Sequence, residues 1–172
     1  MGTISLKKLN WCRIMMWILR NIKVLCEDTF FRGAFCGAVA GVLKDIFDLI
    51  FYFFNAKEIF FWSFASVVAF DQLPKDLFMN IIAVILEIIF SAFLGIVFAL
   101  IVPKMKTPHF LFMGIFYGSM VWFFIRAIIV SYKIIELKQP PTAIRPVITW
   151  ILSMIFGVIL SWLERRLSPK TS

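Results

Sequence analysis

The chain has 172 residues, of which 62% are apolar and only 16% are charged, and its mean hydropathy is +0.93. This composition excludes an ordinary soluble domain and predicts an all-α, polytopic membrane protein. The net charge of +8 would suit a protein that binds nucleic acid. However, the sequence has no soluble basic segment interleaved with aromatic residues, so we expect no nucleic-acid partner.

The first segment, residues 1–28, predicts a basic amphipathic helix that lies on the membrane surface. Its Lys and Arg residues fall mainly on one helical face, and its apolar residues fall largely on the other. Arg13 and Arg20 interrupt the apolar stretch, and no small-residue cleavage site follows, so a cleaved signal peptide is not expected. The positive face predicts binding to anionic lipid headgroups.

Four apolar stretches are long enough to cross about 30 Å of hydrocarbon as helices. In chain order they are Phe30–Phe54, Leu77–Val102, His109–Val130 and Pro146–Leu163. A fifth apolar run, residues 59–70, would reach only about 18 Å as a helix, so we expect it to be re-entrant or interfacial. Residues 29–167 thus form a predicted four-helix transmembrane bundle, and residues 168–172 form a cytoplasmic tail.

The orientation of the chain follows from its basic residues. Outside the membrane core, eleven Lys and Arg residues, including Arg32 near the start of the first span, fall on the side that carries both termini, and five fall on the opposite side. Because loops rich in Lys and Arg stay in the cytoplasm, we expect both termini to be cytoplasmic.

Each predicted span carries a stripe of small residues at intervals of four, the spacing that keeps side chains on one helical face. Small residues let helix backbones approach closely inside a membrane, so we expect the four stripes to face one another in one packing seam. The predicted packing residues are Gly33, Gly37, Gly41, Ser91, Gly95, Gly114, Gly118, Ser153, Gly157 and Ser161.

Asp45, Glu87 and Arg126 each occupy the polar end of a stripe. With Lys44 and Asp48, they should share one charged layer in the outer half of the bundle. A charge that faces lipid costs at least about 2.5–3.5 kcal/mol, so these residues must face one another or water. Spacing predicts a Lys44–Asp48 pair on one helix, and depth allows a Glu87–Arg126 pair between the second and third spans. Asp45 is then left over, and a surplus buried carboxylate would take up a proton or hold a cation.

Two interpretations of this charged layer stay open. Its ion pairs could serve only to fix the packing of the helices, or the layer could be a solvated site for a ligand or an ion. The sequence shows no nucleophile with a base, no metal-ligand pattern and no Gly-rich phosphate loop. We therefore expect no enzymatic activity, no metal and no cofactor.

The third and fourth spans, GIFYGSMVWFFIRAII (114–129) and RPVITWILSMIFGVILSW (145–162), resemble the YqhR-type conserved membrane proteins of Gram-positive bacteria. In that family, a pattern of Gly, Tyr-Gly and Trp marks one span, and a polar segment with Thr begins the last span. The matching residues here are Gly114, Tyr117, Gly118, Trp122, Thr149 and Gly157. The resemblance implies four spans in a bacterial plasma membrane, and it implies no activity.

Two classes of function fit these features. The main expectation is a non-enzymatic structural or regulatory partner of other membrane proteins, in contact with the lipid bilayer and with a second copy of the chain or another membrane protein. The alternative is a binding or transport component for a small molecule or an ion, such as the substrate-capturing subunit of a multi-subunit transporter. The charged layer favours this alternative, as does a weak repeat that aligns Gly33 with Gly114 and Asp45 with Arg126.

Overall fold

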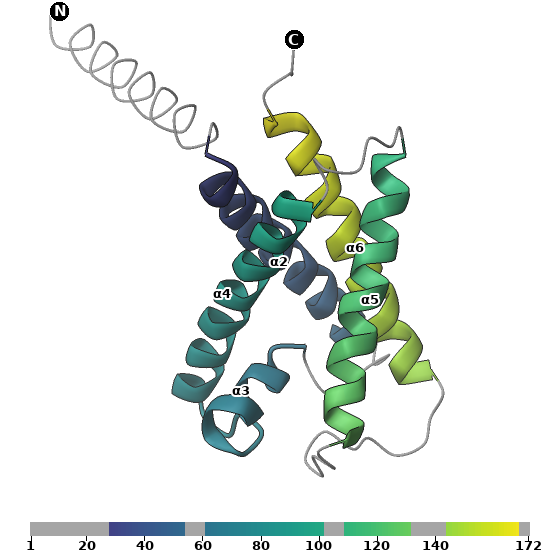
Figure 1. Cartoon of the computed structure of the whole chain (residues 1–172). Helices are drawn as coiled ribbons and strands as arrows, with labels where there is room; N and C mark the ends of the chain where they lie inside the picture. Colours follow the sequence, from purple (N-terminus) through teal and green to yellow (C-terminus); the bar gives the residue numbers. More distant parts are fainter. Residues whose placement is uncertain (1–27, 54–60, 102–108, 132–143, 169–172) are drawn as a thin grey trace, which may run out of the picture.

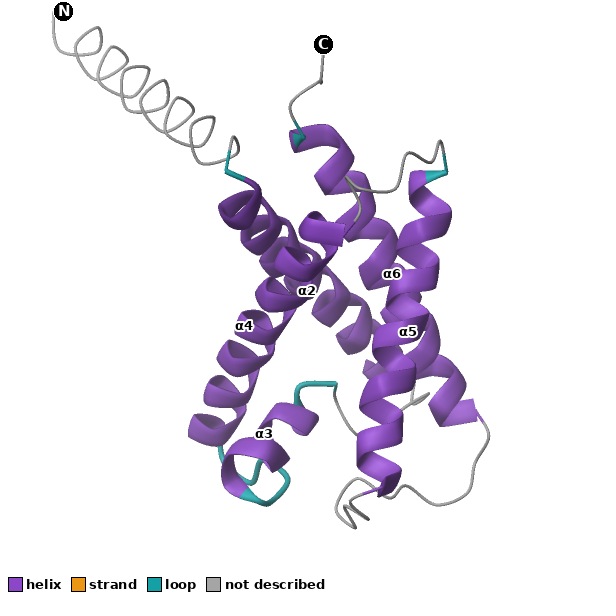
Figure 2. Ribbon diagram, viewed as in Figure 1, coloured by secondary structure: helices purple, strands orange, loops and turns teal. Residues whose placement is uncertain are grey.

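The computed structural model describes residues 28–53, 61–101, 109–131 and 144–168, and every regular element in these ranges is a helix (Figures 1 and 2). The expectation of an all-α protein is therefore confirmed for this part of the chain. The helices are α2 (Thr29–Phe53), α3 (Ser63–Phe70), α4 (Leu77–Ile101), α5 (Phe110–Ser131) and α6 (Ile144–Leu167). Apart from Asp28 and Ser168, the predicted N-terminal basic helix and the predicted tail lie outside the described residues.

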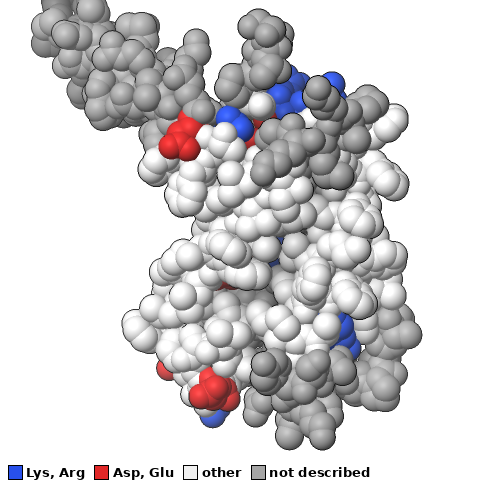
Figure 3. Space-filling view, viewed as in Figure 1, with Lys and Arg blue, Asp and Glu red and all other residues white. Residues whose placement is uncertain are grey.

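Three of the described helices are long and apolar enough to cross a membrane, over Leu77–Ile101, Phe110–Ile129 and Pro146–Leu167. Large apolar side chains are exposed along them, among them Phe112 at 70% and Phe124 at 65%. On the face drawn in Figure 3, most charged atoms lie toward the two ends of the molecule, and the broad band between them is uncharged except for a few recessed atoms. These features are compatible with an integral membrane protein, because lipid-facing surfaces are apolar.

Two other helices differ from these three in charge or in length. α2 has 25 residues, as α4 does, but four of its residues are charged. α3 has 8 residues and would reach only about 12 Å, so it is too short to cross a bilayer by itself. Its position relative to the membrane stays a prediction.

The four long helices form two antiparallel pairs (Figure 1). α2 packs along α4, α5 packs along α6, and contacts between α2 and α6 join the two pairs. α3 packs against α4. The start of α2 and the end of α6 lie at the same end of the molecule.

Glycines bring the helices of each pair into backbone contact. In the first pair, a Cβ atom added to Gly37 of α2 would lie only 2.8 Å from Cα of Gly95 on α4. In the second pair, a Cβ atom added to Gly118 of α5 would lie 2.8 Å from the carbonyl carbon of Ser153 on α6. The small-residue stripes thus meet in two separate seams, α2 with α4 and α5 with α6, instead of in one seam of four.

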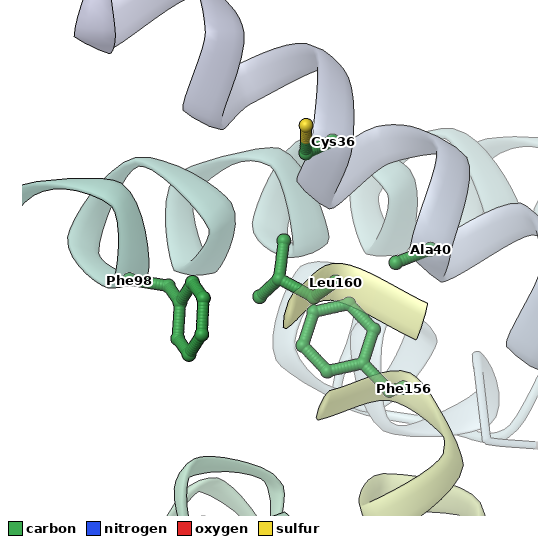
Figure 4. Packing of buried hydrophobic residues seen from close by; sticks show 5 residues of the cluster. All are labelled: Cys36, Ala40, Phe98, Phe156 and Leu160. Atoms are coloured by element: carbon green, nitrogen blue, oxygen red, sulfur yellow. The ribbon is translucent and has the colours of Figure 1, made fainter. Parts of the chain in front are cut away.

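Larger side chains fill the space between the two pairs. The buried apolar cluster comprises Cys36 and Ala40 of α2, Phe98 of α4, and Phe156 and Leu160 of α6 (Figure 4). Small α2 side chains thus oppose large α6 side chains. The two pairs are joined by packed side chains, whereas the helices within each pair are joined by backbone contacts. This difference explains why the four stripes do not share one seam.

Candidate functional site

The candidate site is a buried charged cluster, defined here as Lys44 and Asp45 of α2 with Glu87 of α4. The Lys44 ammonium donates a hydrogen bond to Oε1 of Glu87, and its Nζ atom lies 3.0 Å from Oδ1 of Asp45. Nζ also lies 3.7 Å from the centre of the Phe61 ring. The three residues are between 2% and 8% exposed, so one buried ammonium group serves two buried carboxylates.

The two carboxylates of the charged cluster are incompletely paired. Within the described part of the chain, neither oxygen of Asp45 accepts a hydrogen bond, and Oε2 of Glu87 accepts none. One positive charge against two negative charges leaves a surplus of one negative charge. A buried charge without full compensation costs several kcal/mol, so this arrangement favours the uptake of one further positive charge.

Asp48 lies one turn further along α2 and is completely buried. Its Oδ2 atom accepts a hydrogen bond of 2.7 Å from the backbone N–H of Phe61, which precedes α3. The predicted Lys44–Asp48 pair is wrong, because Lys44 instead reaches across the seam to Glu87 on α4. Asp48 helps to hold the backbone of Phe61, two residues before α3, against α2.

Arg126 is half-buried on α5, and the predicted Glu87–Arg126 pair is also wrong. The partner of Glu87 is Lys44, because the glycine seam holds α4 against α2 and brings the long lysine side chain within reach. α5 instead approaches α4 through Tyr117, whose O–H donates a hydrogen bond of 2.6 Å to the carbonyl oxygen of Leu94. The structure thus brings together Lys44, Asp45 and Glu87, with Asp48 one turn away and Arg126 outside their ion pairs.

A small cavity of about 20 Å³ adjoins the charged cluster. Residues from both helix pairs line it, so it lies where the two pairs meet: Lys44, Phe61, Glu87, Phe90, Ser91, Leu94, Val121, Ile125, Ser153 and Phe156. A volume of this size holds about one water molecule. Figure 3 shows a few basic and acidic atoms in a recess of the surface, between the charged ends of the molecule.

A second buried ion pair joins the two helix pairs at the other end of α2. Nε of Arg32, in the first turns of α2, lies 2.7 Å from Oε1 of Glu164, near the end of α6, and both side chains are 3% exposed. From the sequence, Arg32 is expected only to be a basic residue outside the membrane core, and Glu164 is not among the predicted site residues. A signal was available, because opposite charges stand near the start of the first span and the end of the last, on the same side of the membrane.

Polar side chains also cross the seam between α5 and α6. Nε1 of Trp122 donates a hydrogen bond of 3.0 Å to Oγ1 of Thr149, and Nε1 of Trp150 donates one of 3.2 Å to Oγ of Ser119. Trp122 and Thr149 are two of the residues on which the resemblance to the YqhR-type family depends. Their contact gives this pattern a packing role.

Comparisons of the chain with protein-family models, curated proteins and solved structures find no match. The YqhR-type resemblance therefore stays a prediction. Among the described residues, no group of three or more His, Cys, Asp and Glu side chains is placed to hold a metal ion. The functional argument consequently depends on the charged cluster and its cavity.

Proposed function

We propose that the chain is a non-enzymatic, four-span membrane protein that binds a small positive charge, either a proton or a monovalent cation, inside its helix bundle. The observation that supports this proposal is the surplus carboxylate of the charged cluster, in which Lys44 is the only described basic residue that pairs with Asp45 and Glu87. Uptake of one positive charge neutralises the cluster. A chain of four spans would perform this role as the binding component of a larger membrane assembly.

The pattern of exposed and buried side chains along α2 supports this helix as a membrane span in addition to α4, α5 and α6. Its charged residues Lys44, Asp45 and Asp48 are turned into the protein and are at most 8% exposed. Exposed apolar residues, such as Ile46 (49% exposed) and Ile50 (44% exposed), form its outer surface. A helix with this distribution presents an apolar face to lipid although its sequence is interrupted by charges.

We expect both termini to be cytoplasmic in a bacterial plasma membrane, because basic residues are concentrated on the side of the termini. A reporter fused after Ser172 should read as cytoplasmic. A single cysteine at Lys138, in a cysteine-free background, should react with an impermeant maleimide added outside the cell. An external reading for the fusion would contradict the predicted orientation, and together with a cytoplasmic N-terminus it would mean an odd number of crossings.

The charged cluster makes a direct prediction for Asp45→Asn. This change removes the surplus negative charge and leaves Lys44 paired with Glu87. The melting temperature of the wild-type chain in detergent should rise when the pH is lowered from 9 to 6 or when Na⁺ replaces choline, since either condition supplies the missing positive charge. The Asp45→Asn variant should lose at least half of this response.

The matched control for that experiment is Asp71→Asn. Asp71 is an exposed carboxylate at a left-handed position (φ 55°) after α3, and Asn is also tolerated in this conformation. The control should therefore respond to pH and Na⁺ as the wild type does. An unchanged response in Asp45→Asn would contradict the proposed binding of a positive charge at the cluster.

A second candidate function is that of a structural or regulatory partner, and the surface of α5 favours it. Phe112, Phe116, Phe123 and Phe124 of this helix are each between 58% and 70% exposed. Such a face suits lipid or a helix of another membrane protein. Purification from mild detergent distinguishes the candidates: a stoichiometric ATPase module would support transport, and a stoichiometric enzyme or receptor subunit would support regulation.

A further inference from the structure

On the basis of the proposed function, we infer that the positive charge taken up by the charged cluster is a proton, which binds Oε2 of Glu87 and exchanges through the adjoining cavity. The cavity therefore serves as a site for one water molecule that hands over the proton. This inference names the ligand and the atom that receives it. It depends on the size of the cavity, the chemistry of its wall and the pairing of Glu87.

The size of the described cavity favours a proton over larger ligands. A volume of about 20 Å³ holds one water molecule but no organic amine or sugar, which would need several times more space. A proton carried on that water needs no further volume. The tight glycine contacts between α2 and α4 leave little freedom to enlarge the site from that side.

The wall of the cavity is unsuited to a metal cation. Hard cations are bound by several oxygen atoms, commonly six or more for Ca²⁺ and Mg²⁺. In the described part of the wall, oxygen-bearing side chains come from Glu87, Ser91 and Ser153, and the remaining residues except Lys44 are apolar. The Lys44 ammonium would also repel a second cation held close to it. A proton needs only one carboxylate oxygen.

Glu87 is better placed than Asp45 to receive this proton. Glu87 lines the cavity, whereas Asp45 is not among the lining residues. Oε1 of Glu87 accepts a hydrogen bond from Lys44. Oε2 accepts none from the described residues, although the side chain is buried, with only 5% of it exposed. A buried, unpartnered carboxylate oxygen beside a water-sized cavity is the feature that a proton acceptor requires.

The proton transfer balances the charge of the cluster. A hydronium ion in the cavity gives its proton to Oε2, an O–H bond forms on Glu87, and a neutral water remains. Lys44 keeps its charge and compensates Asp45, at 3.0 Å, so the net charge of the cluster becomes zero. The reverse step returns the proton to water, and no oxidant or co-reactant takes part.

The surrounding charges are consistent with a single proton. On α2, Lys44 and Asp45 face Glu87, and Asp48 is engaged one turn away by the N–H of Phe61. On α5, the residue after the cavity-lining Ile125 is Arg126, which forms no ion pair with Glu87. The described cavity residues of α6 are Ser153 and Phe156, neither of which is charged. Among the described residues of the charged cluster, Lys44, Asp45 and Glu87, one surplus carboxylate therefore remains to be neutralised.

Infrared difference spectroscopy of the full chain in lipid nanodiscs tests the inference. Between high and low pH, the wild type should gain the carbonyl stretch of one protonated carboxylic acid, and this band should shift in D₂O. Glu87→Gln should abolish the band, and Glu87→Asp, which keeps a carboxylate, should restore it at a shifted frequency. Asp71→Asn should leave the band unchanged.

The other variants separate failure of this inference from failure of the proposed function. Loss of the band in Asp45→Asn together with its retention in Glu87→Gln would overturn the assignment to Glu87. If Na⁺ abolishes the band at constant pH and one Na⁺ binds per chain, the ligand is a cation and not a proton. That result would overturn this inference but leave the proposed function standing. If no band forms and the melting temperature responds to neither pH nor Na⁺, both proposals are overturned.

Ser153→Ala provides a variant that leaves all three charged residues in place. It removes one hydroxyl group from the cavity wall, so the water should bind less firmly and the protonated Glu87 should lose part of its hydrogen bonding. The expected result is a carbonyl band of unchanged intensity at a higher frequency. A band with the wild-type frequency would contradict the role assigned to the cavity.

Discussion

Replacing Lys44 by Met should destabilise the folded chain by about 3–5 kcal/mol, because it leaves Asp45 and Glu87 buried without a compensating charge. Met preserves most of the length and volume of the side chain, so the loss reports the charge and not a cavity. The free energy of unfolding can be measured by titration with a denaturing detergent. The loss should become smaller at acidic pH, since protonation of the two carboxylates removes their repulsion.

Two matched variants make this result interpretable. The double change Lys44→Met/Glu87→Gln removes both members of the pair and should recover at least half of the lost stability. Arg165→Met removes a positive charge from an exposed position of α6 and should change the free energy of unfolding by less than about 0.5 kcal/mol. A Lys44→Met effect as small as that of Arg165→Met would show that the charged cluster contributes little to the fold.

The positions of the helices could be predicted because they depend on local properties of the sequence. The predicted span Leu77–Val102 corresponds to α4 at Leu77–Ile101, and His109–Val130 corresponds to α5 at Phe110–Ser131. Length and hydropathy determine such boundaries within each segment. α6 extends four residues beyond its predicted end at Leu163, because Glu164 is buried there against Arg32 and the polar residues continue the helix.

The partners of the helices could not be predicted in the same way. The spacing of Gly33, Gly37 and Gly41 identifies a face that packs closely, but any of the other stripes could have met this face. The observed partner is α4, and this choice decides the chemistry of the site. Once α2 lies against α4, the ammonium group of Lys44 meets Glu87 across the seam instead of meeting Asp48 on its own helix.

The charged residues themselves were identifiable from their cost in an apolar segment, but their pairing was not. Depth along the helix axis placed Glu87 and Arg126 at similar levels, whereas rotation about the axis and the choice of neighbour determine which side chains touch. Long side chains such as Lys44 extend over several ångströms, so spacing along one helix is a weak guide to their partners. The Arg32–Glu164 pair was not predicted because it depends on the contact between α2 and α6, which spacing along one helix does not determine.

The remaining large effect concerns the two glycine seams. Gly37→Ala and Gly157→Ala should each destabilise the chain by about 1–3 kcal/mol, although Ala has the higher intrinsic helix propensity by about 1 kcal/mol. A Cβ atom at Gly157 would lie 2.8 Å from the carbonyl carbon of Gly114 and 3.0 Å from the backbone nitrogen of Gly118. Backbone atoms cannot turn aside as a flexible side chain can, so the two helices must separate.

Because the two seams share no residues, the Gly37→Ala/Gly157→Ala double variant should lose the sum of the two single losses, within about 0.5 kcal/mol. One seam shared by all four helices would instead make the second change much less costly than the first, since the first would already have opened the contact. The matched control is Ala127→Leu, which adds a larger side chain at an exposed position of α5 and should be neutral. If either glycine variant is more stable than the wild type, helix propensity outweighs packing there, and backbone contact does not hold that pair together.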